Sequence, residues 1–354
     1  MIQPRLFFSF PAKHRKVFLA RAPLYQAKEG EYLLNHNRSG LLLALKALKL
    51  PSGSQVGVMV YNCHTVMNAV EQAGFKVCFI DVNDNLRLDL EDLKRKKVGL
   101  SALIVSHLFG IANDMDAIKD VCPDIPIIED CAHAYGMPQC GTKGDFAVFS
   151  IGQGKFPSIG DGGILKVNNQ RYKAVIDLFY SEIPEYGRRQ EWRLFGKLLV
   201  THWLYKPFVY SWLTLPLLKR NNQRIASAKE SAKLQKMSHG ISAVYASVLP
   251  YLDQWKERQQ TVSEYLMGYY KDVNGVYVIN NSPLESNGYM FPLYCVHSEE
   301  VKTELRHKGI EAETHFRHCL IWAKEFGYEK GDCPNAENLL CHLIMIPTYK
   351  ELKL

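Results

Sequence analysis

The chain has 354 residues, enough for about two domains and a sizeable buried core. Hydrophobic residues make up 47% of it and charged residues 22%, a composition that excludes a disordered or fibrous protein. The formal net charge is +7. Residues 187–224 contain eight Lys or Arg and one acid, Glu191, so this single segment accounts for the whole surplus.

The nine cysteines are odd in number and form no C-x-x-C pair, which argues against a disulfide framework and against a zinc site. We therefore predict free thiols, a reducing compartment and no metal. The first residues have too short an apolar run, and no small-residue cleavage site, for a secretory signal. The expected location is the cytoplasm.

From residue 41 to about 170, helical periodicity alternates with short apolar, β-branched runs, as in βαβ units. The expected strands are 56–61, 77–82, 102–107, 125–130, 146–151 and 163–167. The expected helices are 41–48, 65–74, 86–97 and 115–121. Continuous apolar runs favour strands buried on both faces. The pattern predicts an α/β fold with a largely parallel sheet flanked by helices.

The last third of the chain has the mixed content of a small α/β domain. Long helices are expected over 236–273, interrupted near Pro250, followed by a strand over 291–296 and a helix over 299–309. The expected domains are a large one over 1–245 and a smaller C-terminal one over 246–354.

Polar residues that follow apolar runs are the first candidates for a site, because ligands of parallel α/β sheets bind beyond the carboxyl ends of strands. Asp130 and Ser150 lie at such ends. Lys155 comes five residues after Ser150, in a loop that continues into GDGG at 160–163. Arg38, Ser39 and Gly40 precede the first helix of the repeating pattern.

These residues together could hold a phosphorylated cationic heterocycle beside an amine nucleophile. Backbone N–H groups of Arg38 to Gly40 at a helix N-terminus favour a phosphate, and Ser150 could add a donor. Asp130 could keep a pyridine nitrogen protonated, and Lys155 could form a Schiff base with an aldehyde. Each piece alone is more often a cap, a turn residue or a solvated lysine. Only the ordered combination predicts a pyridoxal-phosphate enzyme.

That combination resembles the DegT-like sugar aminotransferases, a family of fold type I pyridoxal-phosphate enzymes. The resemblance covers about 30–170 and 237–350, and its most specific stretches are HLFGIANDMDAI (107–118), IPIIEDCAHAYG (125–136) and FSIGQGKFPSIGDGG (149–163). It implies a fold type I architecture with a large cofactor domain and a smaller C-terminal domain. It also implies a homodimer, because family active sites lie at subunit interfaces.

The resemblance implies a role for each matching residue. Asp130 would bind the pyridine nitrogen, His133 would lie near the ring hydroxyl, Ser150 would bind phosphate, and Lys155 would be the Schiff-base lysine. The aromatic residue that commonly stacks on the cofactor aligns with Cys63. The Asn-Tyr-Arg segment that reaches a neighbouring subunit's phosphate is replaced by Leu-Gln-Lys at 234–236. His315 falls where the family often has a His-aromatic pair near the substrate.

The implied reaction moves an amino group from a donor such as glutamate to a keto-sugar, generally nucleotide-linked, for surface polysaccharide or glycoconjugate biosynthesis. Related dehydrating enzymes have a histidine in place of the lysine, so Lys155 favours transfer. Two alternatives stay open. One is a non-catalytic or regulatory, membrane-associated relative, and the other is an aminotransferase for a non-sugar ketone.

The basic segment contains three of the five tryptophans, and residues of about 180–232 form an insertion relative to the family. His202, Lys206 and two prolines interrupt its apolar run, which argues against a transmembrane helix. Three interpretations remain. The insertion packs on the main domain or a dimer partner, or Arg188 and Arg189 attract a nucleotide diphosphate. Alternatively, 187–224 contacts an anionic membrane surface, placing the protein peripherally at the inner face. No recognised module predicts nucleic-acid binding.

Overall fold

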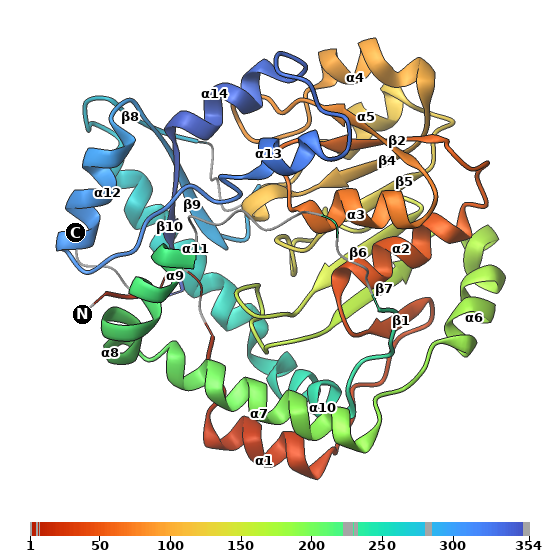
Figure 1. Cartoon of the computed structure of the whole chain (residues 1–354), viewed down its shortest axis with the longest axis horizontal. Helices are drawn as coiled ribbons and strands as arrows, with labels where there is room; N and C mark the ends of the chain where they lie inside the picture. Colours follow the sequence, from red (N-terminus) through yellow and green to blue (C-terminus); the bar gives the residue numbers. More distant parts are fainter. Residues whose placement is uncertain are drawn as a thin grey trace.

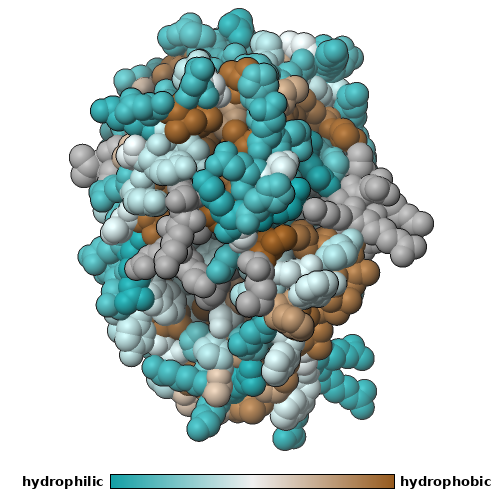
Figure 2. Space-filling model, turned by 90° about the vertical axis from the view of Figure 1, so that its left-hand side faces the viewer, coloured by the Kyte–Doolittle hydropathy of each residue, from teal (hydrophilic) through white to brown (hydrophobic). Residues whose placement is uncertain are grey.

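The computed structural model describes residues 2–4, 6, 8–221, 229, 233–279 and 285–349, without the side chains of 219–221. Within these residues a seven-stranded sheet runs in the order β1-β7-β6-β5-β4-β2-β3, and helices cover both of its faces (Figure 1). A three-stranded antiparallel sheet, β10-β9-β8, lies beside it. Figure 2 shows the surface of one side, on which apolar residues interrupt a largely hydrophilic covering.

The strands of the large sheet are β1 (Glu31–Leu34), β2 (Gln55–Met59), β3 (Lys76–Ile80), β4 (Leu100–Ser106), β5 (Ile127–Asp130), β6 (Phe146–Ser150) and β7 (Gly163–Val167). Neighbouring strands from β6 through β3 are parallel, whereas β7 is antiparallel to both β6 and β1. No helix separates β6 from β7, because their connection is the loop that carries Lys155. The expected α/β fold with a largely parallel sheet is confirmed.

Helices α2 (Asn37–Ala47), α3 (His64–Gln72), α4 (Leu90–Lys96), α5 (Met115–Val121) and α6 (Lys173–Glu182) flank this sheet, with short 3-10 turns η1 (Lys97–Gly99), η2 (Leu108–Gly110) and η3 (Gln170–Tyr172). Alternate side chains of each strand face opposite layers. Val58 and Ile104 pack in the cluster that contains α2 and α3. Leu103 and Val105 pack in the cluster that contains α4 and α5. The strands are therefore buried on both faces, as their apolar runs indicated.

The C-terminal part contains α10 (His239–Val248), η5 (Leu249–Tyr251), α11 (Leu252–Tyr270), β8 (Val276–Val278), β9 (Met290–Cys295), α12 (Ser298–His307), α13 (Cys319–Lys324), α14 (Pro334–His342) and β10 (Leu343–Pro347). The predicted interruption near Pro250 is the 3-10 turn η5. Leu266, Phe291 and Ile344 form the core of the small sheet. Ala323 and Leu339, by contrast, extend the core of the large sheet, so the domain boundary at 245 stays a prediction.

The segment expected to be an insertion forms α7 (Arg188–Leu204), α8 (Pro207–Val209), the π-helical turn η4 (Tyr210–Thr214) and α9 (Leu215–Asn221). Its residues beyond Asn221, apart from Lys229, lie outside the described residues, and its status as an insertion stays a prediction. Leu194 and Leu198 of α7 pack in one cluster with Phe18 of α1 (Ala12–Ala20). None of the helices in the described ranges is long and apolar enough to cross a membrane.

Candidate active site

The parallel strands β2, β4, β5 and β6 end at the same edge of the large sheet, and polar side chains gather there. Asn62 Nδ2 donates to Ser106 Oγ at 2.8 Å, and Ser106 Oγ donates to Asp130 Oδ2 at 3.2 Å. Asn37 Nδ2 donates to the other carboxylate oxygen of Asp130 at 3.0 Å. Three polar side chains from separate segments therefore fix the orientation of one buried carboxylate.

A cavity of about 270 Å³ opens above this edge. Its lining includes six of the residues predicted to bind the cofactor, which are Arg38, Cys63, Asp130, His133, Ser150 and Lys155. Ser39 and Gly40 are fully buried and do not line it. The Ser39 hydroxyl instead donates to Asn35 Oδ1 at 2.7 Å. The structure thus brings the acid, the histidine and the lysine together, while Ser39 is buried and bonded to the Asn35 side chain.

The start of α2 explains the position of Ser39. The predicted helix start at residue 41 was wrong, because α2 begins at Asn37 after the extended residue His36. Ser39 and Gly40 therefore lie inside the helix instead of preceding it. The N-terminus of α2 still faces the cavity, since Asn37 and Arg38 both line it. Backbone N–H groups of a first helical turn lack intrahelical partners and suit a phosphate.

The GDGG turn holds this helix start in place. Asp161 Oδ1 lies 2.8 Å from His36 Nδ1, and Gly162 adopts a φ of +111° that favours glycine. A Cβ atom at Gly163 would lie 2.4 Å from the His36 carbonyl carbon, so only glycine fits there. The turn therefore lets β7 begin directly against the N-terminus of α2.

Lys155 and His133 are in direct contact in the cavity. Lys155 Nζ lies 2.7 Å from His133 Nε2. His133 Nδ1 accepts the backbone N–H of Phe109 at 3.1 Å, so the proton of the neutral ring is on Nε2. His133 therefore donates to Lys155, and the only acceptor that Lys155 can offer is the lone pair of its uncharged amine.

The electrostatics of this pair favour the same protonation states. Burial lowers the pKa of Lys155, although Cys63 and Asp130 act in the opposite direction. Burial and the Lys155 charge lower the pKa of His133 well below its ordinary value. Both lowered pKa values favour the uncharged forms that the hydrogen bonds indicate, and the uncharged amine is the form that attacks an aldehyde.

Two phenylalanines enclose the His133 ring from strained backbone positions. Phe109 and Phe316 have φ values of 55° and 54°, in the left-handed region that bulky residues rarely adopt. Phe316 stacks on His133 at 5.8 Å with the ring planes 9° apart, and Phe109 stacks at 5.5 Å. This packing fixes the plane of the imidazole toward Lys155.

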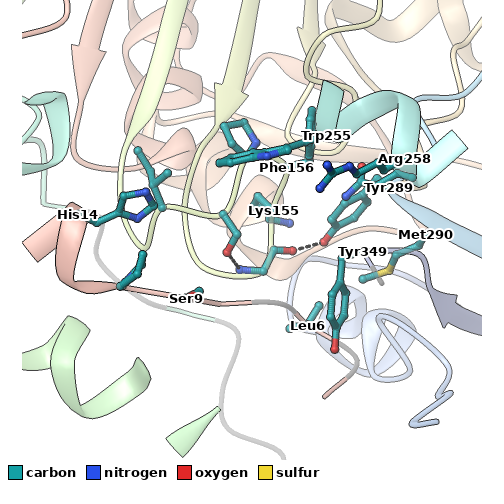
Figure 3. Close-up of a pocket in the computed structure, with 16 residues that line it drawn as sticks. Leu6, Ser9, His14, Lys155, Phe156, Trp255, Arg258, Tyr289, Met290 and Tyr349 are labelled. Atoms are coloured by element: carbon teal, nitrogen blue, oxygen red, sulfur yellow. Dashed lines mark hydrogen bonds between the residues drawn. The ribbon is translucent and has the colours of Figure 1, made fainter. Parts of the chain in front are cut away.

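Two residues that precede β9, Asn287 and Tyr289, bond to the backbone at or next to His133 and Lys155. Asn287 Nδ2 donates to the carbonyl oxygens of His133 at 2.9 Å and Tyr135 at 3.1 Å. The Tyr289 hydroxyl donates to the Gly154 carbonyl, directly before Lys155, as Figure 3 shows. The C-terminal part of the chain therefore positions both halves of the His133–Lys155 pair.

The cavity residues fit pyridoxal phosphate. Burial raises the pKa of Asp130, and the N–H of Ala132, Asn37, Lys155 and Ser106 only partly offset this effect. A protonated pyridine nitrogen would place an opposite charge beside this carboxyl group and favour its ionised form. Asn37 Oδ1 is buried without a hydrogen-bond partner and lines the same cavity. Arg38, Ser150 and the start of α2 would serve the phosphate.

Two larger cavities adjoin this one. A cavity of about 940 Å³ shares Cys63 and Phe316 with it and is lined by His315. A cavity of about 370 Å³ lies along the Lys155 loop, between Trp255, Tyr289 and Tyr349 (Figure 3). His315 thus lies beside the candidate substrate space, with its ring 5.8 Å from that of His133.

Arg188 lies elsewhere. It lines a separate cavity of about 240 Å³ with Arg21 and Trp192, and the structure does not bring it to Lys155. Arg189 is exposed and lines none of these cavities. A substrate role for these two arginines stays a prediction.

One buried trio in the described part of the chain has spacing that a metal ion could use: His107, Glu129 and Cys131. Glu129 already accepts three backbone N–H groups, at 2.6 to 2.7 Å, and contacts His107 Nε2 at 3.0 Å. These hydrogen bonds satisfy its carboxylate, so we assign the trio a structural role.

Sequence reasoning missed several contributors. Ser106 could have been found, because it ends an apolar strand just as Asp130 does. Asn37 precedes the segment chosen for the phosphate by one residue. Asn287, Tyr289 and Phe109 carry no local signal, since their roles depend on contacts between distant segments.

The fold and the Asp130–Lys155 cavity define an enzyme of the fold type I pyridoxal-phosphate class. The sequence model of the DegT/DnrJ/EryC1/StrS aminotransferase family matches residues 34–354, and the chain belongs to that family.

Three proteins that are similar to this chain in sequence or in structure have names that refer to sugar metabolism. The chain is 31% identical to the GDP-perosamine synthase of Vibrio cholerae over 137 residues, which are 36% of this chain and 37% of that enzyme. It is 23% identical to the spore coat polysaccharide biosynthesis protein SpsC of Bacillus subtilis over 95% of this chain and 87% of that protein. The sugar aminotransferase CalS13 from Micromonospora echinospora shares the fold with a TM-score of 0.74 and 18% identity, over 98% of this chain and 95% of that one.

Proposed function

We propose that this aminotransferase moves an amino group from glutamate to the ketone of a nucleotide-linked sugar. The observation that supports the proposal most is the placement of the Lys155 amine in one cavity with Asp130. A non-catalytic relative would have no need for a buried lysine amine in one cavity with a buried carboxylate.

Different residues of the cavity would bind different parts of pyridoxal phosphate. Asp130 would bind the protonated pyridine nitrogen, His133 the ring hydroxyl, and Arg38, Ser150 and the start of α2 the phosphate. Bound there, pyridoxal phosphate would supply the electron sink for the electrons of the broken Cα–H bond.

Lys155 would carry the proton. Its uncharged amine would take the proton from Cα of the amino donor and return it as an ammonium N–H. In the cofactor-free protein His133 donates to the amine lone pair, which favours the uncharged form. Asp130 would keep the pyridine nitrogen protonated, which would stabilise negative charge at the reacting carbon.

We propose that the second substrate occupies the cavity of about 940 Å³. It adjoins the cofactor cavity through Cys63 and Phe316, whereas the cavity of about 370 Å³ adjoins it through Lys155 alone. Arg317 lines the larger cavity and is our candidate for the diphosphate, in place of Arg188 and Arg189. His315 would contact the sugar.

The names of the relatives support a sugar ketone as the second substrate. GDP-perosamine synthase and a spore coat polysaccharide biosynthesis protein are both named for sugar chemistry. A role in polysaccharide biosynthesis, a cytoplasmic location and a homodimer remain parts of the proposal.

The test is a screen of nucleotide keto-sugars against enzyme pretreated with glutamate, read by mass spectrometry. We expect one keto-sugar to become an amino-sugar. Arg317→Gln should raise KM for the sugar nucleotide roughly 10- to 100-fold, because a charge-assisted hydrogen bond contributes about 1.5–3 kcal/mol. The matched control Arg189→Gln should leave KM unchanged. Consumption of glutamate without amination of any keto-sugar would contradict the sugar assignment.

A further inference from the structure

Helix α7 has two different faces. Its inner face is buried and consists of Glu191, Leu194, Leu198 and His202. The residues of its outer face are spaced three or four positions apart along the sequence, so they form one stripe along the helix. That stripe consists of Arg189, Trp192, Arg193, Lys197, Val200 and Trp203, all exposed. A surface helix whose outer stripe combines tryptophan, valine and basic residues is unusual, because apolar residues normally face the core.

The next helical turns continue the pattern. Phe208 is 64% exposed and Trp212 74% exposed, and Leu213 and Leu217 are also exposed. Figure 1 places α8 and α9 at the lower left of the molecule, and Figure 2 shows apolar residues gathered on the lower right of that side. Large apolar side chains grouped in this way mark an interaction surface.

The exposed surface of α7, α8 and α9 is basic, which favours an anionic partner. Among the described residues 187–218, Glu191 is the only acid. It is buried and accepts Ser238 Oγ at 2.7 Å and the His239 N–H at 2.9 Å, so it does not offset the exposed bases. A two-fold contact with a second copy would bring this basic surface against itself, and like charges would oppose it.

We infer that α7, α8 and α9 dock on an anionic membrane surface. Tryptophan and phenylalanine suit the boundary between head groups and acyl chains, and lysine and arginine bind anionic lipid. The interruptions of the segment agree with a helix that lies on a membrane instead of crossing it.

Docking would bring the substrate cavity close to the lipid. Tyr205, Tyr210, Leu215 and Leu218, from the same segment, line the cavity of about 940 Å³. The segment that would contact the lipid is therefore also part of the wall of this cavity. The docking surface itself does not depend on the proposed reaction, because its residues lie outside the cofactor cavity.

The test is flotation of the cofactor-loaded protein with two kinds of vesicle. We expect binding to phosphatidylcholine vesicles that contain phosphatidylglycerol, little binding to pure phosphatidylcholine, and release at high salt. The variant Arg189→Gln/Arg193→Gln/Lys197→Gln should lower the partition coefficient roughly a hundred-fold, at about five-fold per charge. Phe208→Ser/Trp212→Ser should also release the protein.

Val98→Ser/Tyr277→Ser is the matched control, since both residues are exposed and lie elsewhere. Cofactor absorbance and the glutamate reaction should be unchanged in every variant, which verifies folding. Sedimentation should show the same oligomeric state throughout. Failure of the wild type to float with anionic vesicles, or dissociation of an oligomer by Phe208→Ser/Trp212→Ser, would overturn the inference; the second result would assign the surface to a second copy.

Discussion

At the scale of single residues, one backbone N–H fixes the tautomer of His133 and, through it, the hydrogen bond to Lys155. The Phe109 N–H bonds to His133 Nδ1, which leaves Nε2–H to face Lys155. Phe109 can take this position because its backbone adopts a positive φ, imposed by tertiary packing. The spacing of Asp130, Ser150 and Lys155 was visible in the sequence, whereas this contact was not.

The pair gives a prediction for His133. His133→Phe retains a ring for the packing with Phe109 and Phe316 but removes the donor to Lys155. The pKa of Lys155 should then rise, and capture of pyridoxal phosphate by the cofactor-free protein at neutral pH should slow roughly five-fold, since a hydrogen bond contributes about 1 kcal/mol. The rate is measured by the growth of visible absorbance. His133→Gln keeps an N–H donor and should stay near the wild-type rate. Equal slowing in both variants would argue against the donor role.

At the scale of elements, long periodic segments were predictable and short contacts between segments were not. The runs at 146–151 and 163–167 correspond to β6 and β7, because apolar residues fill most positions of a strand buried on two faces. Strand β1 has only four residues. The first turn of α2 depends on Gly163, more than a hundred residues away. Neither gives a local signal.

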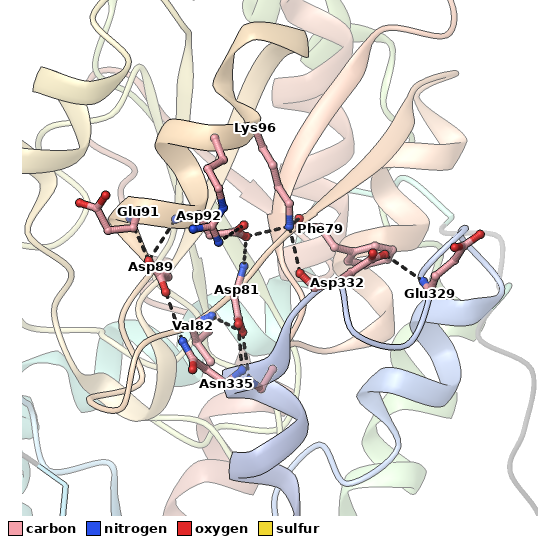
Figure 4. A network of polar contacts seen from close by, with 12 residues as sticks. Phe79, Asp81, Val82, Asp89, Glu91, Asp92, Lys96, Glu329, Asp332 and Asn335 are labelled. Carbon is pink, nitrogen blue, oxygen red and sulfur yellow. Dashed lines mark hydrogen bonds and ion pairs between the residues drawn. The ribbon is translucent and has the colours of Figure 1, made fainter.

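Figure 4 shows a second contact of this kind. Asp81, which follows β3, accepts the N–H groups of Asn335 and Ala336, both at 2.9 Å, at the start of α14. Asp92 holds the Asp81 backbone N–H at 2.8 Å. The C-terminal helix is thus capped by a carboxylate from the large sheet.

Glu129 gives a prediction at this scale. It accepts the N–H groups of Gly141, Lys143 and Gly144, so it ties β5 to the loop before β6. Glu129→Gln replaces one acceptor oxygen by an N–H donor and should lower the free energy of unfolding by about 1–3 kcal/mol. Glu91→Gln, on the exposed face of α4, should change it little.

The pH dependence of this loss has a defined sign. Burial raises the pKa of Glu129, but the hydrogen bond and charge of His107 and the backbone N–H groups outweigh it, and the pKa is lowered. The carboxylate therefore stabilises the fold fully above the ordinary glutamate pKa, and this stabilisation fades as pH falls through the lowered value. The difference between wild type and Glu129→Gln in denaturant unfolding should shrink in acid. A difference that grows in acid would contradict the assignment.

At the scale of the whole molecule, the candidate site depends on contacts between the large sheet and the C-terminal part of the chain. The Tyr61 hydroxyl, from the large sheet, donates to the His315 carbonyl at 2.6 Å, while Asn287 and Tyr289 hold the segments of His133 and Lys155. The sequence motifs indicated pyridoxal phosphate as the cofactor, a largely parallel sheet and a smaller C-terminal α/β part. They did not indicate the width of the adjoining cavity or which side chains of 187–224 face outward, since both depend on how that segment packs.

The measurement that tests the proposed chemistry most directly is the reaction of the cofactor-loaded protein with glutamate alone. Visible absorbance and 2-oxoglutarate are followed together after removal of free pyridoxal phosphate. We predict that glutamate bleaches the visible band and releases 2-oxoglutarate in proportion to bound cofactor, and that Lys155→Ala slows this by at least roughly 10²- to 10⁴-fold. Release of 2-oxoglutarate by Lys155→Ala at the wild-type rate, or none from the wild type, would contradict an amino transfer centred on Lys155.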